Sequence, residues 1–158
     1  MTVGNFVALN GTKILERVTE INLRGVGCEV GGRRILTDFH RTFVRGKIYC
    51  FVGKNGAGKS TLMNLICGII PLTRGEIFFD GIPLSEVDMI HTRRNLIAAF
   101  AKSADVLILD EPDNNLDAGA VDALTKQISA EAANRITIII SHDERLIELA
   151  DEVLTLSV

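Results

Sequence analysis

The sequence is poor in several features that would point directly to a class of function. It has no tryptophan, one tyrosine and three cysteines, and 20 Asp and Glu residues outnumber 17 Lys and Arg residues. This acidic balance argues against a polybasic protein that binds nucleic acid. A membrane-spanning helix needs roughly 18–20 apolar residues. The longest apolar run, residues 62–72, is interrupted by Asn64, Gly68 and Pro71. We therefore expect no nucleic-acid partner and no membrane span within this sequence.

The three cysteines, Cys28, Cys50 and Cys67, are odd in number and lie in largely apolar sequence surroundings. This pattern favours buried, reduced thiols in an intracellular protein over a disulfide or a metal site. No basic segment precedes the first apolar stretch, so we expect no signal peptide. A chain of 158 residues suits one domain with a core of its own, and we expect that domain to be cytoplasmic.

Short β-favouring runs alternate with helical patterns along the chain. This alternation predicts an α/β fold with a mostly parallel sheet flanked by helices. Asp117 and Asp143 precede two helical patterns, at about 118–133 and 144–150, as N-caps do. The stretch before Phe39 predicts a small antiparallel region, a hairpin that turns at Gly31-Gly32. The predicted strands are residues 48–52, 76–80, 106–110, 136–140 and 153–156.

The strongest motif is GKNGAGKS, which fits the phosphate-loop pattern at every fixed position. An apolar strand pattern leads into it and a helical pattern leads out, a context that a chance glycine-rich turn would lack. Glycines let the backbone point successive N–H groups at phosphate oxygens, and the helix presents its positive end to the same anion. Lys59 is predicted to bridge the terminal phosphates, and the Ser60 hydroxyl to ligate Mg2+. The predicted nucleotide-binding residues are Gly53, Lys54, Asn55, Gly56, Ala57, Gly58, Lys59, Ser60 and Thr61.

A second motif, VLILDEP at residues 106–112, brings two carboxylates to the end of an apolar strand. In open α/β sheets, the carboxyl ends of the strands form the edge at which ligands bind. Asp110 is predicted to hold Mg2+, directly or through water. Glu111 is predicted to act as general base on the water that attacks the γ-phosphate. Without the phosphate loop, the same two acids would suit a solvated strand end equally well.

A third apolar strand pattern, residues 136–140, is followed by the sequence SHD. Its histidine, His142, is a candidate to contact the γ-phosphate or to orient the attacking water, since even a neutral imidazole has one N–H donor. A solvated or capping histidine is the alternative. His40 and His91 belong to no motif, and we interpret both as solvated or capping residues.

Together these motifs resemble the nucleotide-binding domain of the ABC (ATP-binding cassette) ATPases, which are P-loop NTPases. The phosphate loop, VLILDEP, NNLD (114–117) and ISHD (140–143) occur in the order typical of that family. The resemblance covers about residues 21–156. The stretch GEIFFDGIPLSEVD at residues 75–88 is most similar to ABC exporters.

The resemblance implies a role for each motif residue. Asp110 resembles the magnesium-holding aspartate and Glu111 the catalytic base. His142 resembles the switch histidine, and Asp117 the aspartate that communicates across the dimer interface of the family. Asp113 stands where the family commonly has a small hydroxyl residue, and we assign it no role from the sequence.

The departures from the family are as informative as the matches. The family places a glutamine between the phosphate loop and the DEP strand, whereas the only glutamine here is Gln127. No glycine lies between Gly81 and Gly119, so the Leu-Ser-Gly-Gly-Gln signature is absent. Residues 93–101 run from the approach to the missing glutamine into the helix that normally follows the signature. The resemblance therefore implies that the helical subdomain is deleted. Val30 falls where the family usually has an aromatic ring that stacks on adenine.

The resemblance implies an ATP-binding domain over residues 21–158. This domain is shortened between the phosphate loop, or Walker A motif, and VLILDEP, which corresponds to the Walker B motif. Residues 1–20 precede it as a segment of uncertain structure. We expect the domain to bind ATP and Mg2+ and to hydrolyse ATP slowly for transport. A transmembrane subunit or domain would hold it at the cytoplasmic face of the membrane. A homodimer would lack the signature contact.

Two other functions remain open. The first is a non-catalytic nucleotide-binding or interaction module derived from an ABC ATPase. The second is a DNA-repair ATPase of the same superfamily, which fits less well because such proteins carry long insertions where this chain is shortened.

Overall fold

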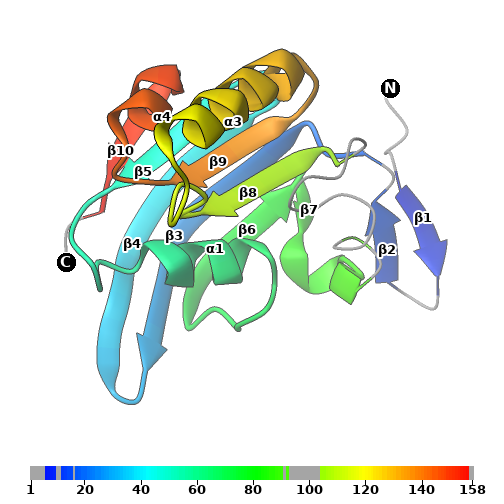
Figure 1. Ribbon diagram of the computed structural model, residues 1–158. Coiled ribbons are helices and arrows are strands. Elements are labelled where there is room, and N and C mark those ends of the chain that lie inside the picture. Colours follow the sequence, from blue (N-terminus) through cyan, green and yellow to red (C-terminus); the bar gives the residue numbers. More distant parts are fainter. Residues whose placement is uncertain (1–5, 10–11, 16, 91, 93–103, 157–158) are drawn as a thin grey trace.

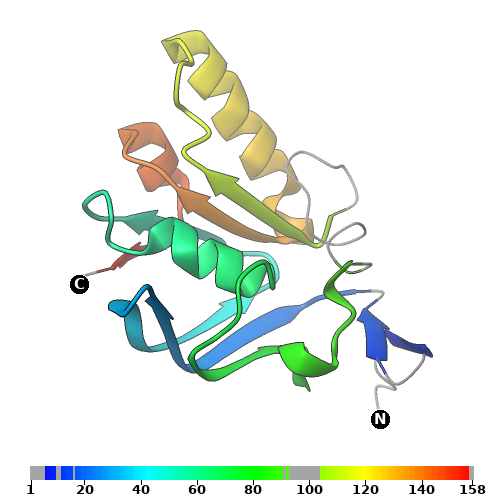
Figure 2. The same ribbon diagram turned by 90° about the horizontal axis from the view of Figure 1, so that it is seen from below.

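Two sheets and their helices stack in layers in the part of the molecule that the structure describes (Figures 1 and 2). Helices α3 (Ala118–Glu131) and α4 (Glu144–Leu149) cover one face of a parallel sheet. Helix α1 (Lys59–Ile66) packs between that sheet and an antiparallel one. The computed structural model describes residues 6–9, 12–15, 17–90, 92 and 104–156.

The first sheet is parallel, and its strands follow in the order β10 (Glu152–Thr155), β5 (Ile48–Val52), β9 (Ile136–Ile140) and β8 (Val106–Asp110). Every residue of β9 is buried, because packed helices cover both faces of the sheet. Four of the five predicted strands agree with these to within a residue, whereas the one predicted at residues 76–80 belongs to the antiparallel sheet. Since all four strands run the same way, the ends of β5, β8 and β9 meet at one edge, where the three motifs emerge.

The second sheet is antiparallel, with its strands in the order β4 (Arg33–Val44), β3 (Glu20–Val30), β6 (Arg74–Phe79) and β7 (Ile82–Pro83). The predicted hairpin is β3 and β4, and Gly31 and Gly32 form its turn with φ angles of 58° and 76°. The sheet is larger than the small antiparallel region that the sequence predicted, because β6 pairs with β3. Two short strands, β1 (Phe6–Leu9) and β2 (Thr12–Leu15), pair with each other.

The helices begin where the sequence predicted. The Asp117 carboxylate accepts a hydrogen bond from the Ala120 amide at 2.8 Å, and the Asp143 carboxylate accepts one from the Arg145 amide at 2.9 Å. Helix α1 follows directly from Gly58, whose left-handed backbone turns the phosphate loop into the helix. Two short 3-10 helices, η1 (Leu84–Glu86) and η2 (Ala132–Asn134), follow β7 and α3. The α/β class predicted from the sequence is confirmed.

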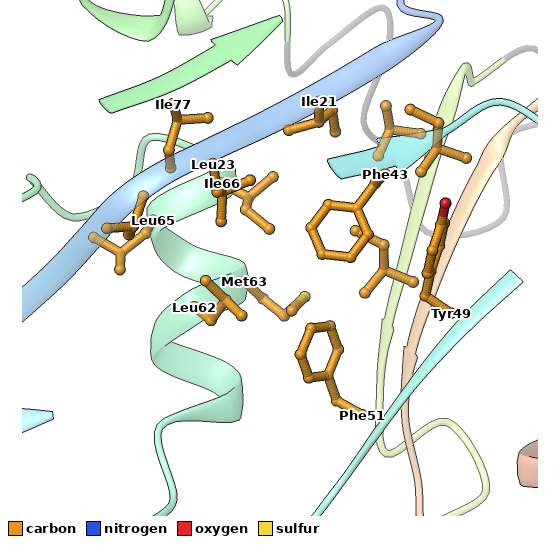
Figure 3. Close-up of a cluster of buried hydrophobic side chains, with 14 of the residues drawn as sticks. Ile21, Leu23, Phe43, Tyr49, Phe51, Leu62, Met63, Leu65, Ile66 and Ile77 are labelled. Atoms are coloured by element: carbon orange, nitrogen blue, oxygen red, sulfur yellow. The ribbon is translucent and has the colours of Figure 1, made fainter. Parts of the chain in front are cut away.

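One apolar cluster joins the two sheets through α1, as Figure 3 shows. The rings of Phe43 and Tyr49 meet edge to face, with their centroids 4.9 Å apart. Full burial of one large apolar side chain contributes roughly 1.5–3 kcal/mol, so this cluster is the main restraint on the position of one sheet relative to the other. Its members include Ile21, Leu23, Phe43, Tyr49, Phe51, Leu62, Met63, Leu65, Ile66 and Ile77.

The cysteines agree with the prediction of reduced thiols. Cys28 and Cys50 are buried and Cys67 is half-buried, and in the described part of the chain none of the three forms a disulfide. Burial raises the pKa of the Cys50 thiol, so this group stays neutral. Among the described residues, no helix has both the length and the hydropathy needed to cross a bilayer.

Candidate functional site

The phosphate loop curls between the end of β5 and the start of α1. Three of its glycines have positive φ angles: 136° at Gly53, 83° at Gly56 and 91° at Gly58. A residue with a side chain rarely adopts such angles, which explains the glycine spacing of the motif. The Ala57 amide donates to the Lys54 carbonyl at 3.1 Å and closes the turn. The first turn of α1 then adds its free N–H groups to the same side.

Lys59 is buried at the base of the loop, with 6% of its surface exposed. Its ammonium group donates to the Gly53 carbonyl at 2.7 Å and to the Lys54 carbonyl at 2.9 Å. An ammonium group has three N–H donors. The two carbonyls therefore position the charge and leave one donor for an anion in the loop.

Ser60 and Asp110 come from different motifs and lie in direct contact. The Ser60 hydroxyl donates to the Asp110 carboxylate at 2.7 Å, and both residues are exposed. Hydroxyl and carboxylate oxygens are hard donors that suit Mg2+, which usually keeps several water ligands and binds substrate phosphates. Nowhere in the described part of the chain do three or more His, Cys, Asp and Glu side chains form a metal-binding group. The pair therefore fits a magnesium ion that is shared with a nucleotide better than a site formed by the protein alone.

Glu111 follows β8 with a left-handed backbone, at φ 48°. Such an angle is uncommon for a residue other than glycine, and it is maintained by surrounding contacts. The Glu111 amide donates to the Ile140 carbonyl at the end of β9, at 2.8 Å. The Asn114 side-chain amide donates to the Glu111 carboxylate at 2.7 Å. Neighbouring groups therefore hold both the backbone and the carboxylate of Glu111.

Two adjoining hollows open over these residues. The first, of about 400 Å³, is lined by Arg33, Ile35, Asn55, Gly56, Gly58, Lys59, Ser60, Thr61 and Glu111. The second, of about 480 Å³, is lined by Lys54, Asn55, Glu111, Asp113, Asn114 and His142. They share Asn55 and Glu111, so the phosphate loop, the end of β8 and His142 line two hollows that meet at these residues. The buried Lys59 and the candidate metal ligand Ser60 border the first hollow, and the candidate histidine His142 borders the second.

Arg33 and Ile35 are lining residues that the sequence reasoning missed. Both lie at the start of β4, and Ile35 lies so close to Gly58 that a Cβ there would be 3.0 Å from the Ile35 carbonyl oxygen. The only feature of the sequence that could have pointed to them is that they follow closely after the predicted hairpin turn at Gly31-Gly32. Val30, at the position where the family has its aromatic ring, is 57% exposed and is not among the lining residues. None of the residues that line the first hollow is aromatic.

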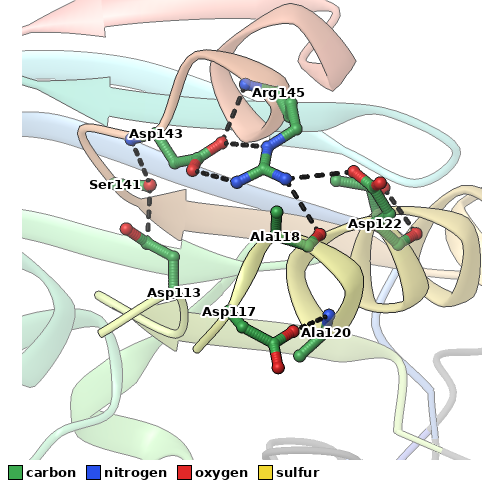
Figure 4. Close-up of polar contacts among 9 residues, drawn as sticks. Asp113, Asp117, Ala118, Ala120, Asp122, Ser141, Asp143 and Arg145 are labelled. Atoms are coloured by element: carbon green, nitrogen blue, oxygen red, sulfur yellow. Dashed lines mark hydrogen bonds and ion pairs between the residues drawn. The ribbon is translucent and has the colours of Figure 1, made fainter. Parts of the chain in front are cut away.

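A polar network connects the His142 segment to the end of β8 and to α3 (Figure 4). The Ser141 hydroxyl donates to the Asp113 carboxylate at 2.7 Å and accepts a hydrogen bond from the Asp143 amide at 2.9 Å. Arg145 pairs with Asp143 at 2.8 Å and with Asp122 on α3 at 3.1 Å. The network therefore fixes both residues that flank His142.

The remaining residues named from the sequence lie elsewhere. Asp117 caps α3, and its carboxylate is thereby engaged. On the antiparallel sheet, the exposed His40 ring bonds to the Gly25 amide and to Asp38. His91 and residues 93–101, where the deletion is inferred, lie outside the described residues.

Comparisons with known proteins bear on this site. The family model described as "ABC transporter" matches residues 36–98, which include the phosphate loop. The ATP-dependent lipid A-core flippase of Syntrophus aciditrophicus is 31% identical over 133 residues, covering 82% of this chain and 22% of the flippase. The energy-coupling factor transporter ATP-binding protein EcfA1 of Thermotoga maritima is 37% identical over 89 residues, covering 56% of this chain and 33% of that protein.

A solved structure has the same fold. A bacterial Atm1-family ABC exporter with ATP bound matches 99% of this chain and 39% of its own, with a TM-score of 0.79 and 18% sequence identity. A likeness at that identity concerns the fold alone. The chain spans about a fifth of the length of the flippase and a third of the length of EcfA1.

Proposed function

Because this chain shares its sequence pattern and its fold with the ATP-binding domains of ABC transporters, we propose that it binds Mg-ATP and hydrolyses it slowly to drive transport across a membrane. The observation that carries the proposal is the 2.7 Å contact between Ser60 and Asp110. It joins the phosphate loop to the acidic motif at the point where a nucleotide phosphate and its metal ion would meet.

Each residue predicted from the motifs has a chemical task in this proposal. The loop amides and Lys59 bind the phosphates, while Ser60 and Asp110 hold Mg2+, which neutralises phosphate charge when it is bound. Glu111 accepts a proton from the attacking water, and His142 donates a hydrogen bond to the γ-phosphate or to that water. Since phosphoryl transfer depends on positioning and on charge stabilisation, these fixed groups are what the reaction needs from the protein.

Two sequence features support slow turnover. Gln127 is the only glutamine, so the glutamine that senses the metal and the γ-phosphate in the family has no counterpart here. The absence of glycine between Gly81 and Gly119 leaves no signature motif. In the family, ATP binds between two domains, with the phosphate loop of one facing the signature motif of the other. Losing the signature side of that site should slow the reaction more than it weakens binding, because charge stabilisation acts mostly on the transition state.

We propose that the ATP-binding domain spans residues 21–158 and that residues 1–20 are an N-terminal segment outside it. The partner is a transmembrane subunit or domain, which holds the domain at the cytoplasmic face of the membrane. The flippase and the exporter are both far longer than this chain, which is consistent with such a partner. A homodimer of this chain would lack the signature contact and would therefore be weak.

The missing signature also favours a second candidate, a nucleotide-binding module without catalysis. Such a module needs the phosphate loop but has no need of Glu111 or His142. Both residues nevertheless line the hollow, and Asn114 holds the Glu111 carboxylate. This arrangement favours the catalytic proposal over the second candidate.

A magnesium-dependent titration tests the proposal. We expect saturable ATP binding by the full chain and loss of that binding in Lys59→Ala, because the loop loses its only buried ammonium group. Glu111→Gln should bind ATP normally and lose phosphate release. Absence of ATP binding by the folded parent would refute the proposal. Binding without any phosphate release in the parent would favour the non-catalytic module.

A further inference from the structure

We propose that Asp113 is a positioning residue that, through Ser141, holds His142 at the subsite of the nucleotide γ-phosphate. The inference rests on the proposed function, since it assigns a part of that same site. It gives a role to a carboxylate that stands where the ABC family commonly has a small hydroxyl residue. Asp113 lines the second hollow, but its carboxylate is engaged by the Ser141 hydroxyl. In this proposal it acts by fixing the position of His142 and not by binding the nucleotide.

The contact between Asp113 and Ser141 fixes the Ser141 side chain. The hydroxyl donates to the Asp113 carboxylate at 2.7 Å and accepts from the Asp143 amide at 2.9 Å. A hydroxyl has one donor hydrogen, and here it is directed to a carboxylate, which forms a stronger hydrogen bond than a neutral acceptor does. Ser141 is fully buried, so water cannot readily replace Asp113 as its partner.

His142 lies between two residues that are held in this way. Ser141 is bonded to Asp113 on one side, and on the other side Asp143 is paired with Arg145. The imidazole itself is exposed toward the hollow, and within the described residues no hydrogen bond holds it. The position of the ring therefore depends on the backbone of its two neighbours, Ser141 and Asp143, whose contacts Figure 4 shows.

The same contact sets the distance between the histidine and the candidate base. Asp113 lies two residues after Glu111, and Ser141 lies directly before His142. A second bond, from the Glu111 amide to the Ile140 carbonyl at 2.8 Å, joins the same two segments. Asp113 thus completes a two-point link between the ends of β8 and β9, and it lines the same hollow as Glu111 and His142.

The expected effect is specific for the γ-phosphate. If His142 contacts that group, its loss weakens binding of ATP and leaves binding of ADP unchanged. We expect Asp113→Ala and Ser141→Ala to reproduce the loss in His142→Ala. That loss is a roughly ten- to hundredfold rise in the Kd of ATP relative to that of ADP, the scale of one hydrogen bond to a charged group. Asp113→Asn keeps an oxygen acceptor for the Ser141 hydroxyl and should retain the parent ratio.

The experiment is a pair of titrations, with Mg-ATP and with Mg-ADP, on the full-length parent and on each variant. Circular dichroism confirms that each variant is folded. Glu144→Ala is the matched control, because it removes one exposed acidic group from the segment just beyond His142. Asp113→Ala combined with His142→Ala should add nothing to His142→Ala alone, since both changes remove the same contact.

Each outcome bears on one proposal. If the parent and Glu144→Ala bind neither nucleotide, the proposed function fails, and the inference fails with it. If the parent binds ATP but Asp113→Ala or Ser141→Ala leaves the ATP-to-ADP ratio unchanged, the inference alone is wrong. An equal loss of affinity for both nucleotides would assign Asp113 a purely structural role and would also overturn it. If Asp113→Ala does not fold, Ser141→Ala and Asp113→Asn decide between the same outcomes.

Discussion

Gly58 ends the phosphate loop at a crowded position with a left-handed backbone. A Cβ there would lie 3.0 Å from the carbonyl oxygen of Ile35 and 3.1 Å from its Cγ2 atom, at a φ of 91°. Gly56 has a similar φ of 83°, but a Cβ at that position would meet nothing within 4 Å. A substitution at Gly56 therefore tests the backbone angle alone, whereas one at Gly58 tests the backbone angle together with crowding against β4.

We predict that Gly58→Ala destabilises the fold more than Gly56→Ala does. Both variants incur about 1 kcal/mol or more, because alanine disfavours a positive φ. Only Gly58→Ala must also displace the start of β4 from the loop. Urea unfolding followed by far-UV circular dichroism measures both losses of free energy. Equal losses would show that β4 yields freely and does not brace the loop.

At the scale of single residues, sequence motifs predict the groups that act within one short segment. The fixed spacing of the phosphate-loop motif predicted which residues line the loop. The apolar strand pattern predicted the sheet edge at which Asp110 and Glu111 lie. Asp113 received no role, because its partner Ser141 lies 28 residues further along the chain. Arg33 was missed because the hairpin that brings it to the hollow is oriented by packing and not by its own sequence.

Helices α3 and α4 are joined by the side chain of Arg145. It donates to the Ala118 carbonyl at 2.9 Å and pairs with Asp122, both on α3, while also pairing with Asp143 at the start of α4. The hydrogen bond from Arg145 holds the pKa of the Asp143 carboxyl below its ordinary value, and the pairing raises the pKa of Arg145 in turn. The charged form of Asp143 is therefore favoured in the folded state.

This pKa direction predicts a loss of stability in acid. Because the folded-state pKa of Asp143 is lowered, its contribution is complete above the ordinary value of 3.8 and is lost as pH falls through the lower folded value. We expect the stability advantage of the parent over Asp143→Asn to be constant above about pH 5 and to narrow below about pH 4. Urea unfolding between pH 7 and pH 3 measures it. Glu144→Gln, which removes an exposed carboxylate of the same helix, is the control. An advantage that stays constant down to pH 3 would contradict the prediction.

At the scale of elements, the sequence predicted strands and caps better than it predicted sheet membership. The strand that is now β6 was expected at residues 76–80, but its partner β3 lies roughly 50 residues earlier in the chain. A β-favouring run looks the same in either sheet, since its partner is chosen by long-range packing. Helix starts were predictable because a cap such as Asp117 acts on an amide three residues away.

At the scale of the whole molecule, an ion pair ties segments of both sheets together. Arg45, which follows β4, pairs with Asp105, which precedes β8, at 2.6 Å. The other Asp105 oxygen accepts a hydrogen bond from the Val18 amide at 2.9 Å, and Arg45 also donates to the Val18 carbonyl at 3.3 Å. Three segments that are distant in sequence thus meet at one largely buried group, on the side where the strands of the parallel sheet begin.

We predict that Asp105→Ala lowers the free energy of unfolding by about 3 kcal/mol, because it leaves a largely buried cation and an amide without their partner. The control is Glu86→Ala, which breaks the more exposed 2.7 Å pair with Lys13 and should cost less than about 1 kcal/mol. Denaturant unfolding read by Tyr49 fluorescence, which reports the contact of β5 with the antiparallel sheet, measures both losses.

The phosphate loop follows β5 of the parallel sheet, and Ile35 of β4 in the antiparallel sheet contacts it. The shape of the loop therefore depends on the two sheets keeping their relative position. Mg-ATP affinity should therefore stay normal in Asp105→Ala as long as the chain is folded, and should fall only when the sheets separate. A loss of affinity in the fully folded variant would show that the ion pair tunes the site directly.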